Sequence, residues 1–161
     1  MPKSQALETR GRAALRAALS YYVLNGLSAA LGLLVITSLI HLFLGAFAAS
    51  AASIGVIVCI PPDQPAPRRG KFWQLLPAPL IGLPLFVGVQ VLHADPLRLG
   101  MLLVPASFLA FLAAAWGKRG IPLSVSIMFA MIFSMAVPDH TNTATNLATG
   151  LFFALGAGLY L

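Results

Sequence analysis

The side chains that could support acid–base or metal chemistry are few, and they stand at the ends of apolar segments. His41, His93 and His140 each end such a segment, and Asp139 precedes the last of them. Histidine titrates near physiological pH, so this set predicts a proton-sensing or metal site if the segment ends meet. The alternative is that these side chains only favour a membrane interface, where their polar tips remain in water.

Enzyme chemistry finds no support in the motifs. The chain has no GxxxxGK[ST], no HExxH and no paired CxxC pattern. Its single cysteine, Cys59, has no partner for a disulfide within the chain and is expected to act as a small apolar side chain. We therefore expect no enzyme, no cofactor, no resident metal and no nucleic-acid partner.

Neutral polar and methionine side chains within the apolar segments suggest a substrate path. Asn25 and Ser28 share one face of the first segment, and Asn146 belongs to a stripe of small and polar residues in the last. Met128 and Met131 share a face that would suit aromatic ligands. The alternative reading is structural, with the polar residues making interhelical hydrogen bonds and the methionines filling the core.

Composition excludes a soluble protein. Of the 161 residues, 59% are hydrophobic and 9% are charged, whereas about 25% are charged in soluble domains. Charge-free runs are long enough for membrane helices of about 20 residues, and the first run holds two of them. The sequence thus predicts an all-α bundle of six transmembrane helices in the lipid bilayer. We expect the spans at about 20–41, 45–60, 72–92, 97–116, 121–137 and 143–161.

The basic residues sort to one side of these six spans. Nine of the ten lie before the first span, between the second and third, or between the fourth and fifth, and only Arg98 lies on the other side. The positive-inside rule makes the first side cytoplasmic, with both termini inside, and the protein is expected to be a multi-pass membrane protein. The inner rim then carries the basic residues Arg68, Arg69, Lys71, Lys118 and Arg119.

Residues 1–19 are expected in the cytoplasm, ahead of the transmembrane domain at 20–161. Glu8, Arg12 and Arg16 follow one another at four-residue spacing, which favours an interfacial amphipathic helix over residues 5–19. A plain extension of the first span is the alternative. The apolar stretch after residue 16 exceeds the 7–15 residues of a signal peptide, so we expect no cleavage.

Small residues dominate the second span. From Gly45 to Gly55 all but Phe47 and Ile54 are Gly, Ala or Ser, and small residues let helices approach closely in lipid. We therefore expect this span at the centre of the bundle. Further small-residue stripes in the first and last spans favour a homodimer.

The loop after the second span reads Asp63-Gln64-Pro65-Ala66-Pro67 and continues into basic residues. With the Ala-rich span before it and Trp116-Gly117-Lys118-Arg119-Gly120 later, it resembles the fusaric acid resistance (FUSC-like) family of inner-membrane proteins. The resemblance extends from about Leu24 to Val137 and assigns Asp63, Gln64, Pro65 and Pro67 to the loop motif. Asp63 is expected to form a salt bridge that fixes this loop.

The resemblance implies a six-helix membrane half, the N-terminal one, of an aromatic acid exporter. It implies efflux of aromatic or other hydrophobic organic anions, a periplasmic adaptor protein as partner, and a cytoplasmic domain beyond Leu161. A passive anion channel remains an alternative, because no carboxylate lies deep within a span. A non-transporting scaffold for a cytoplasmic domain is the other alternative.

Overall fold

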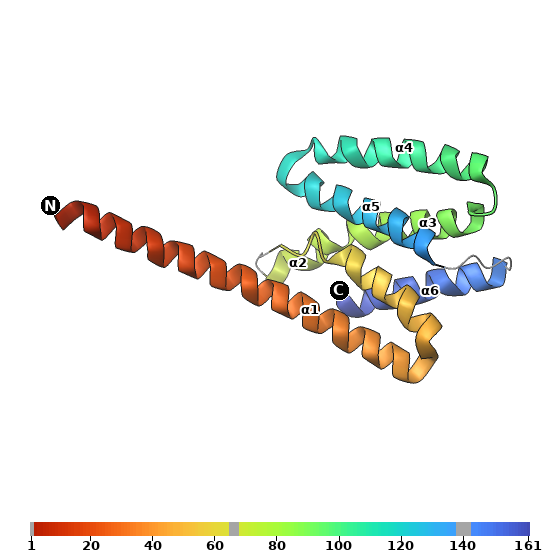
Figure 1. Cartoon of the computed structure of the whole chain (residues 1–161), viewed down its shortest axis with the longest axis horizontal. Helices are drawn as coiled ribbons and strands as arrows, with labels where there is room; N and C mark the ends of the chain where they lie inside the picture. Colours follow the sequence, from red (N-terminus) through yellow and green to blue (C-terminus); the bar gives the residue numbers. More distant parts are fainter. Residues whose placement is uncertain (1, 65–67, 138–142) are drawn as a thin grey trace.

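The computed structural model describes the backbone of residues 2–64, 68–137 and 143–161, and over these residues the chain folds into helices and the turns between them. The all-helical prediction is confirmed for this part of the chain (Figure 1). The helices are α1 (Pro2–Cys59), α2 (Arg68–Leu75), α3 (Pro77–Leu92), α4 (Pro96–Ala114), the 3-10 turn η1 (Gly117–Arg119), α5 (Gly120–Ala136) and α6 (Thr143–Tyr160).

Helix α1 is bent sharply at Gly45, the boundary between the first two predicted spans. The dihedral angles there are φ 87° and ψ 176°, a backbone conformation that residues with a Cβ rarely adopt. The bend divides α1 into a first limb, residues 2–44, and a second limb, residues 46–59. Figure 1 shows the chain turning back at this point, so the second limb returns toward the other end of the bundle.

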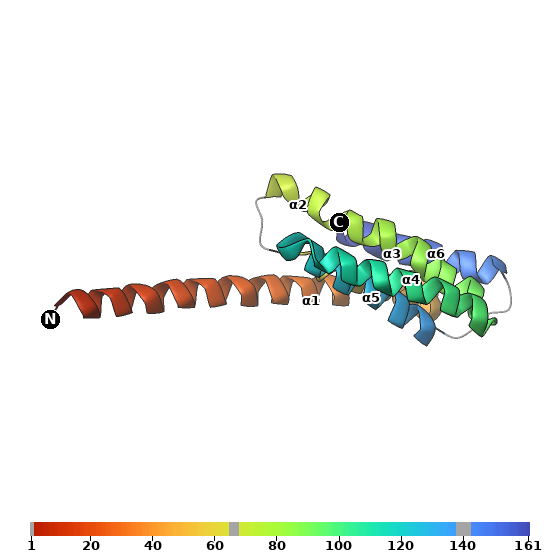
Figure 2. The ribbon, with the colours of Figure 1, turned by 90° about the horizontal axis from the view of Figure 1, so that it is seen from above.

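The N-terminal part of α1 is continuous with the first span. The backbone is helical from Pro2, and Gly45 is the one residue inside α1 with non-helical dihedral angles. Figures 1 and 2 both show this stretch running past the other helices. Residues 5–19 therefore extend the first span as one helix, as in the alternative considered for them.

Three helical stretches in the described part of the chain are long and apolar enough to cross a membrane. They are Tyr22–Cys59, Gly70–Leu92 and Pro96–Ala114. The first of these contains the Gly45 bend, and Gly120–Ala136 and Ala144–Tyr160 are shorter apolar helices. Such long apolar helices indicate association with a membrane.

The bundle has two distinct ends. At one lie residues 60–64, α2, η1 and the end of α6, and we call it the basic end because Lys71 and Lys118 stand there (Figure 1). At the opposite end lie the Gly45 bend, the turn between α3 and α4, and the start of α6. Arg98, near the start of α4, belongs to this opposite end.

The core forms where the second limb, α3, α5 and α6 meet. The rings of Phe86 and Phe153 stack there with centroids 4.8 Å apart, and α4 covers α5 from outside. The second limb is buried over most of its length, which confirms the prediction of a central helix. Its buried residues are Ala48, Ala49, Ala51, Ala52, Ile54, Gly55, Val56, Val58 and Cys59.

Glycine permits the closest contact in this core, between the second limb and α6. A Cβ added to Gly55 would overlap the carbonyl oxygen of Phe153, and one added to Gly156 would overlap the carbonyl oxygen of Ala52. The two backbones therefore touch without intervening side chains. Small residues allow this kind of approach between membrane helices.

Replacing Ala51 by leucine should destabilise the bundle by about 1–3 kcal/mol, because its side chain is fully buried and has no room to grow. The thermal unfolding midpoint in detergent measures the effect. Ala30→Leu, on the exposed side of the first limb, is the matched control and should leave the midpoint unchanged. A normal midpoint for Ala51→Leu would contradict a central second limb.

Candidate ligand pocket and its polar contacts

An open pocket of about 750 Å³ lies at the basic end, between α2 and the start of α3 on one side and the α4–α5 connection on the other. Gln64 of the Asp63–Pro67 motif lines it, and so do Trp116, Lys118 and Gly120 of the later motif. Its lining residues are Pro62, Gln64, Gly70, Trp73, Gln74, Pro77, Trp116, Lys118, Gly120, Pro122 and Leu123.

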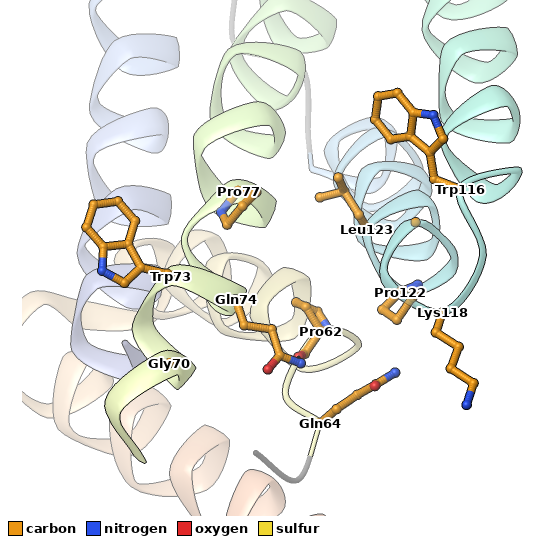
Figure 3. Close-up of a pocket in the computed structure, with 11 residues that line it drawn as sticks. Pro62, Gln64, Gly70, Trp73, Gln74, Pro77, Trp116, Lys118, Pro122 and Leu123 are labelled. Carbon is orange, nitrogen blue, oxygen red and sulfur yellow. The ribbon is translucent and has the colours of Figure 1, made fainter. Parts of the chain in front are cut away.

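Figure 3 shows how these side chains are directed. The side chain of Gln74 points to Pro62 at the floor, and Gln64 extends across the lower edge toward α5. Leu123 and Pro122 form the facing apolar wall, while the ring of Trp73 points away from the centre. The pocket thus combines apolar walls with a few polar groups, as is typical of small-molecule sites.

The charge of the pocket comes from Lys118. Its side chain is exposed, and it has no ion-pair partner among the residues that the structure describes. Lys71, the other predicted rim residue with a described side chain, pairs instead with Asp63. The side chains of Arg68, Arg69 and Arg119 lie outside the described residues. Figure 3 shows the Lys118 side chain directed away from the facing apolar wall, so its positive charge lies at the rim of the pocket.

Both tryptophans of the chain line this pocket and are largely exposed, Trp73 to 73% and Trp116 to 83%. Tryptophan is enriched where a membrane meets water, since its ring is apolar and its N–H is polar. Both exposed rings thus lie at the basic end of the bundle.

Asp63 lies beside the pocket, where it connects its own loop to α2 and to α6. Its carboxylate forms an ion pair with Lys71 of α2 at 2.7 Å and accepts a hydrogen bond from the Tyr160 hydroxyl of α6 at 2.8 Å. The side chain is only 8% exposed. The predicted salt bridge of Asp63 is thereby confirmed, with Lys71 as its partner. Pro65 and Pro67 of the same motif lie outside the described residues.

The backbone around Asp63 has further anchors. The Asn25 side chain of the first limb donates to the carbonyl oxygen of Asp63 at 2.8 Å, and Gln74 donates to that of Pro62 at 2.9 Å. The Tyr160 ring packs on Gly32, where an added Cβ would stand 3.2 Å from the ring. We call this set of contacts, centred on Asp63, the Asp63 junction.

A second polar cluster is buried between α3, α5 and α6. Gln90 donates from its side chain to the carbonyl of Ser134 at 2.7 Å, and the Ser134 hydroxyl donates to the carbonyl of Phe86 at 2.7 Å. Asn146 donates to the carbonyl of Gln90 at 3.5 Å, and its own side-chain oxygen has no partner among the described residues. The sequence reasoning missed Gln90, although an amide near the end of an apolar segment is a readable signal.

Ser134→Ala should cost about 0.5–1.5 kcal/mol, because it removes a buried hydrogen bond between two helices. Ser107→Ala is the control, since that hydroxyl bonds only to Val104 within its own helix, α4. Thermal unfolding of the two variants in detergent compares them. Equal losses would show that the bond between α3 and α5 contributes nothing measurable.

The residues predicted to line one substrate path do not share a cavity. Asn25 lies in the Asp63 junction, Ser28 is exposed on the first limb, and Asn146 stands near the other end of α6. Since Tyr160 also belongs to the junction, the spacing along α6 separates Asn146 from it by about 21 Å. Asn146 makes a hydrogen bond between two helices, and Asn25 bonds to the loop after α1, so both have structural partners.

The methionine face lies against α4. Met128 and Met131 border a shallow apolar groove between α4 and α5, with Met131 buried. They stand apart from the pocket at the basic end, whose lining includes neither residue. In this position the two side chains fill the contact between α4 and α5.

The histidines are only partly described. His41 is exposed near the Gly45 bend, and His93 follows the end of α3 at the same end of the bundle. His140 and Asp139 lie outside the described residues. Among the residues that are described, no three His, Cys, Asp or Glu side chains gather as a metal site.

Comparison with known proteins returned no match among protein-family models, curated proteins or solved structures.

Proposed function

We propose that this chain is a membrane transport subunit that exports aromatic or other hydrophobic organic anions, with its cytoplasmic mouth at the basic end. The observation that carries the proposal is the pocket of about 750 Å³, whose walls are largely apolar and whose rim carries Lys118. An amphipathic anion matches both features. The resemblance to FUSC-like proteins implies the same class of substrate.

The proposal includes six spans with both termini in the cytoplasm of a cell with an inner membrane. The two limbs of α1 with α3, α4, α5 and α6 supply six helical segments, and the described lysines gather at one end of them. The positive-inside rule makes that end cytoplasmic. The exposed tryptophans there fit a boundary between lipid and water.

We also propose a homodimer that works with a periplasmic adaptor and a cytoplasmic domain. The support for a dimer is the small-residue stripe of the first limb, where Ser28 is exposed and free to face another helix. The adaptor and the cytoplasmic domain follow from the family resemblance alone. Cross-linking in native membranes tests the dimer.

Flux through proteoliposomes tests transport. With a panel of aromatic acids we expect saturable flux that responds to a proton gradient. Lys118→Met should raise the half-saturating concentration by a factor of about 1.4 to 5, since an exposed ion pair contributes roughly 0.2–1 kcal/mol. Arg98→Met, at the opposite end, is the matched control and should leave this concentration unchanged.

The alternatives predict other results in the same vesicles. An ohmic anion current without a proton gradient would favour the passive channel. Absence of any flux, with no ligand-induced change in tryptophan emission, would favour the scaffold. Emission responds to a ligand that reaches the edge of the pocket, where both tryptophans of the chain stand.

A further inference from the structure

The loop at residues 60–64 forms one wall of the pocket but has little structure of its own. Its backbone bonds are short-range turns, such as Asp63 N–H to the carbonyl of Ile60 at 3.0 Å. Pro62 and Gln64, the two lining residues of this loop, flank Asp63 on either side. The position of the wall therefore depends on contacts made to other helices.

The described contacts between this loop and other helices are made by Asp63 and by its neighbour Pro62. Lys71 and Tyr160 hold the carboxylate, Asn25 holds the Asp63 carbonyl, and Gln74 holds that of Pro62. A carboxylate that is nearly buried with two partners strongly favours this one geometry, because leaving it unpaired would be costly. The hydrogen bond from Tyr160 connects the wall to α6, and no residue of α6 is among those that line the pocket.

We propose that Asp63 is a positioning residue for the pocket, which it serves by holding Pro62 and Gln64 in place as its wall. The inference rests on the proposed function only in treating the pocket as a ligand site. Asp63 does not line the pocket, so it acts through the loop and not by contact with a ligand. Loss of Lys71 or of the Tyr160 hydroxyl should release the wall without removing any pocket residue.

Spin-label distances measure the wall without any ligand. Labels at Gln64→Cys and Lys118→Cys face each other across the pocket, in a Cys59→Ala background that removes the one native cysteine. We expect a narrow distance distribution for this protein. Tyr160→Phe, which keeps the ring on Gly32 and loses only the hydroxyl, should broaden it, and Lys71→Met should do the same.

Two controls separate a local effect from general loosening. Arg98→Met breaks the exposed ion pair with Asp95 at the opposite end and should leave the distribution narrow. Adding Tyr160→Phe to Asp63→Asn should change nothing further, because residues that act through one another give non-additive effects. Additive effects, or narrow distributions in both Tyr160→Phe and Lys71→Met, would overturn the proposal.

Octanoate titration, monitored by tryptophan emission, tests whether the position of the wall affects ligand binding. Octanoate does not absorb at the excitation wavelength, and both tryptophans border the pocket. Tyr160→Phe should weaken its binding by roughly threefold to tenfold. If octanoate fails to bind the unsubstituted protein while the distances still broaden, the proposed function fails and the positioning role of Asp63 stands. Unchanged octanoate affinity in Tyr160→Phe overturns that role.

Discussion

Replacing Gly156 by leucine should prevent the bundle from closing. The backbones of α6 and the second limb touch at this position, so the obstacle to a Cβ is the carbonyl oxygen of Ala52, which cannot rotate away as a side chain would. The cost should exceed the about 1–3 kcal/mol of ordinary overpacking. We expect little monodisperse protein on size-exclusion chromatography in detergent.

Gly158 provides the matched control on the same helix. Nothing lies within 4 Å of a Cβ built there, so Gly158→Leu should give a normal yield and a normal thermal midpoint. Gly55→Leu, on the opposing helix, should reproduce the failure of Gly156→Leu. If Gly156→Leu and Gly158→Leu behave alike, the two helices do not meet at these glycines.

Cysteine labelling should give an all-or-none difference between the two ends of the bundle. In a Cys59→Ala background, a membrane-impermeant maleimide added from outside should label Ala94→Cys, in the turn before α4, and leave Lys118→Cys unlabelled. The proposed orientation exposes the α3–α4 turn outside and η1 inside. Lys118→Cys should react once the membrane is permeabilised.

The three other outcomes of this experiment are informative. The reverse pattern would invert the orientation while keeping the bundle. Since α4 alone separates the two positions, equal labelling of both from outside would show that α4 does not cross the membrane. Labelling of neither site, before or after permeabilisation, would show that both thiols are shielded by neighbouring residues.

Local composition was enough to predict the helices themselves. The helical class and the central second limb depend on runs without charge and on the density of small residues. The ion pair between Asp63 and Lys71 could be predicted as well, because these residues stand eight positions apart on either side of one loop. In each case the deciding residues are close in sequence.

The features that the sequence could not predict depend on pairing between distant helices. Tyr160 reaches Asp63 across 97 positions, and no periodic pattern connects the two. The residue type of Asn25 and Asn146 favours a polar lining, but their partners are backbone carbonyls, which any part of the chain can offer. The pocket was also beyond prediction, since its two walls come together only when α2 packs near the α4–α5 connection.

The contact between α1 and α6 also bears on the order of assembly during synthesis. The first limb meets α6 through Gly32 and Tyr160, and the second limb meets it through Gly55 and Phe153. These contacts join the first and last helices of the chain, so their contact order is high, which slows folding. In the proposed six-span topology, both limbs enter the membrane before α6 is made, with their small-residue faces uncovered. During synthesis those faces can therefore contact other helices until α6 has been made and packs against them.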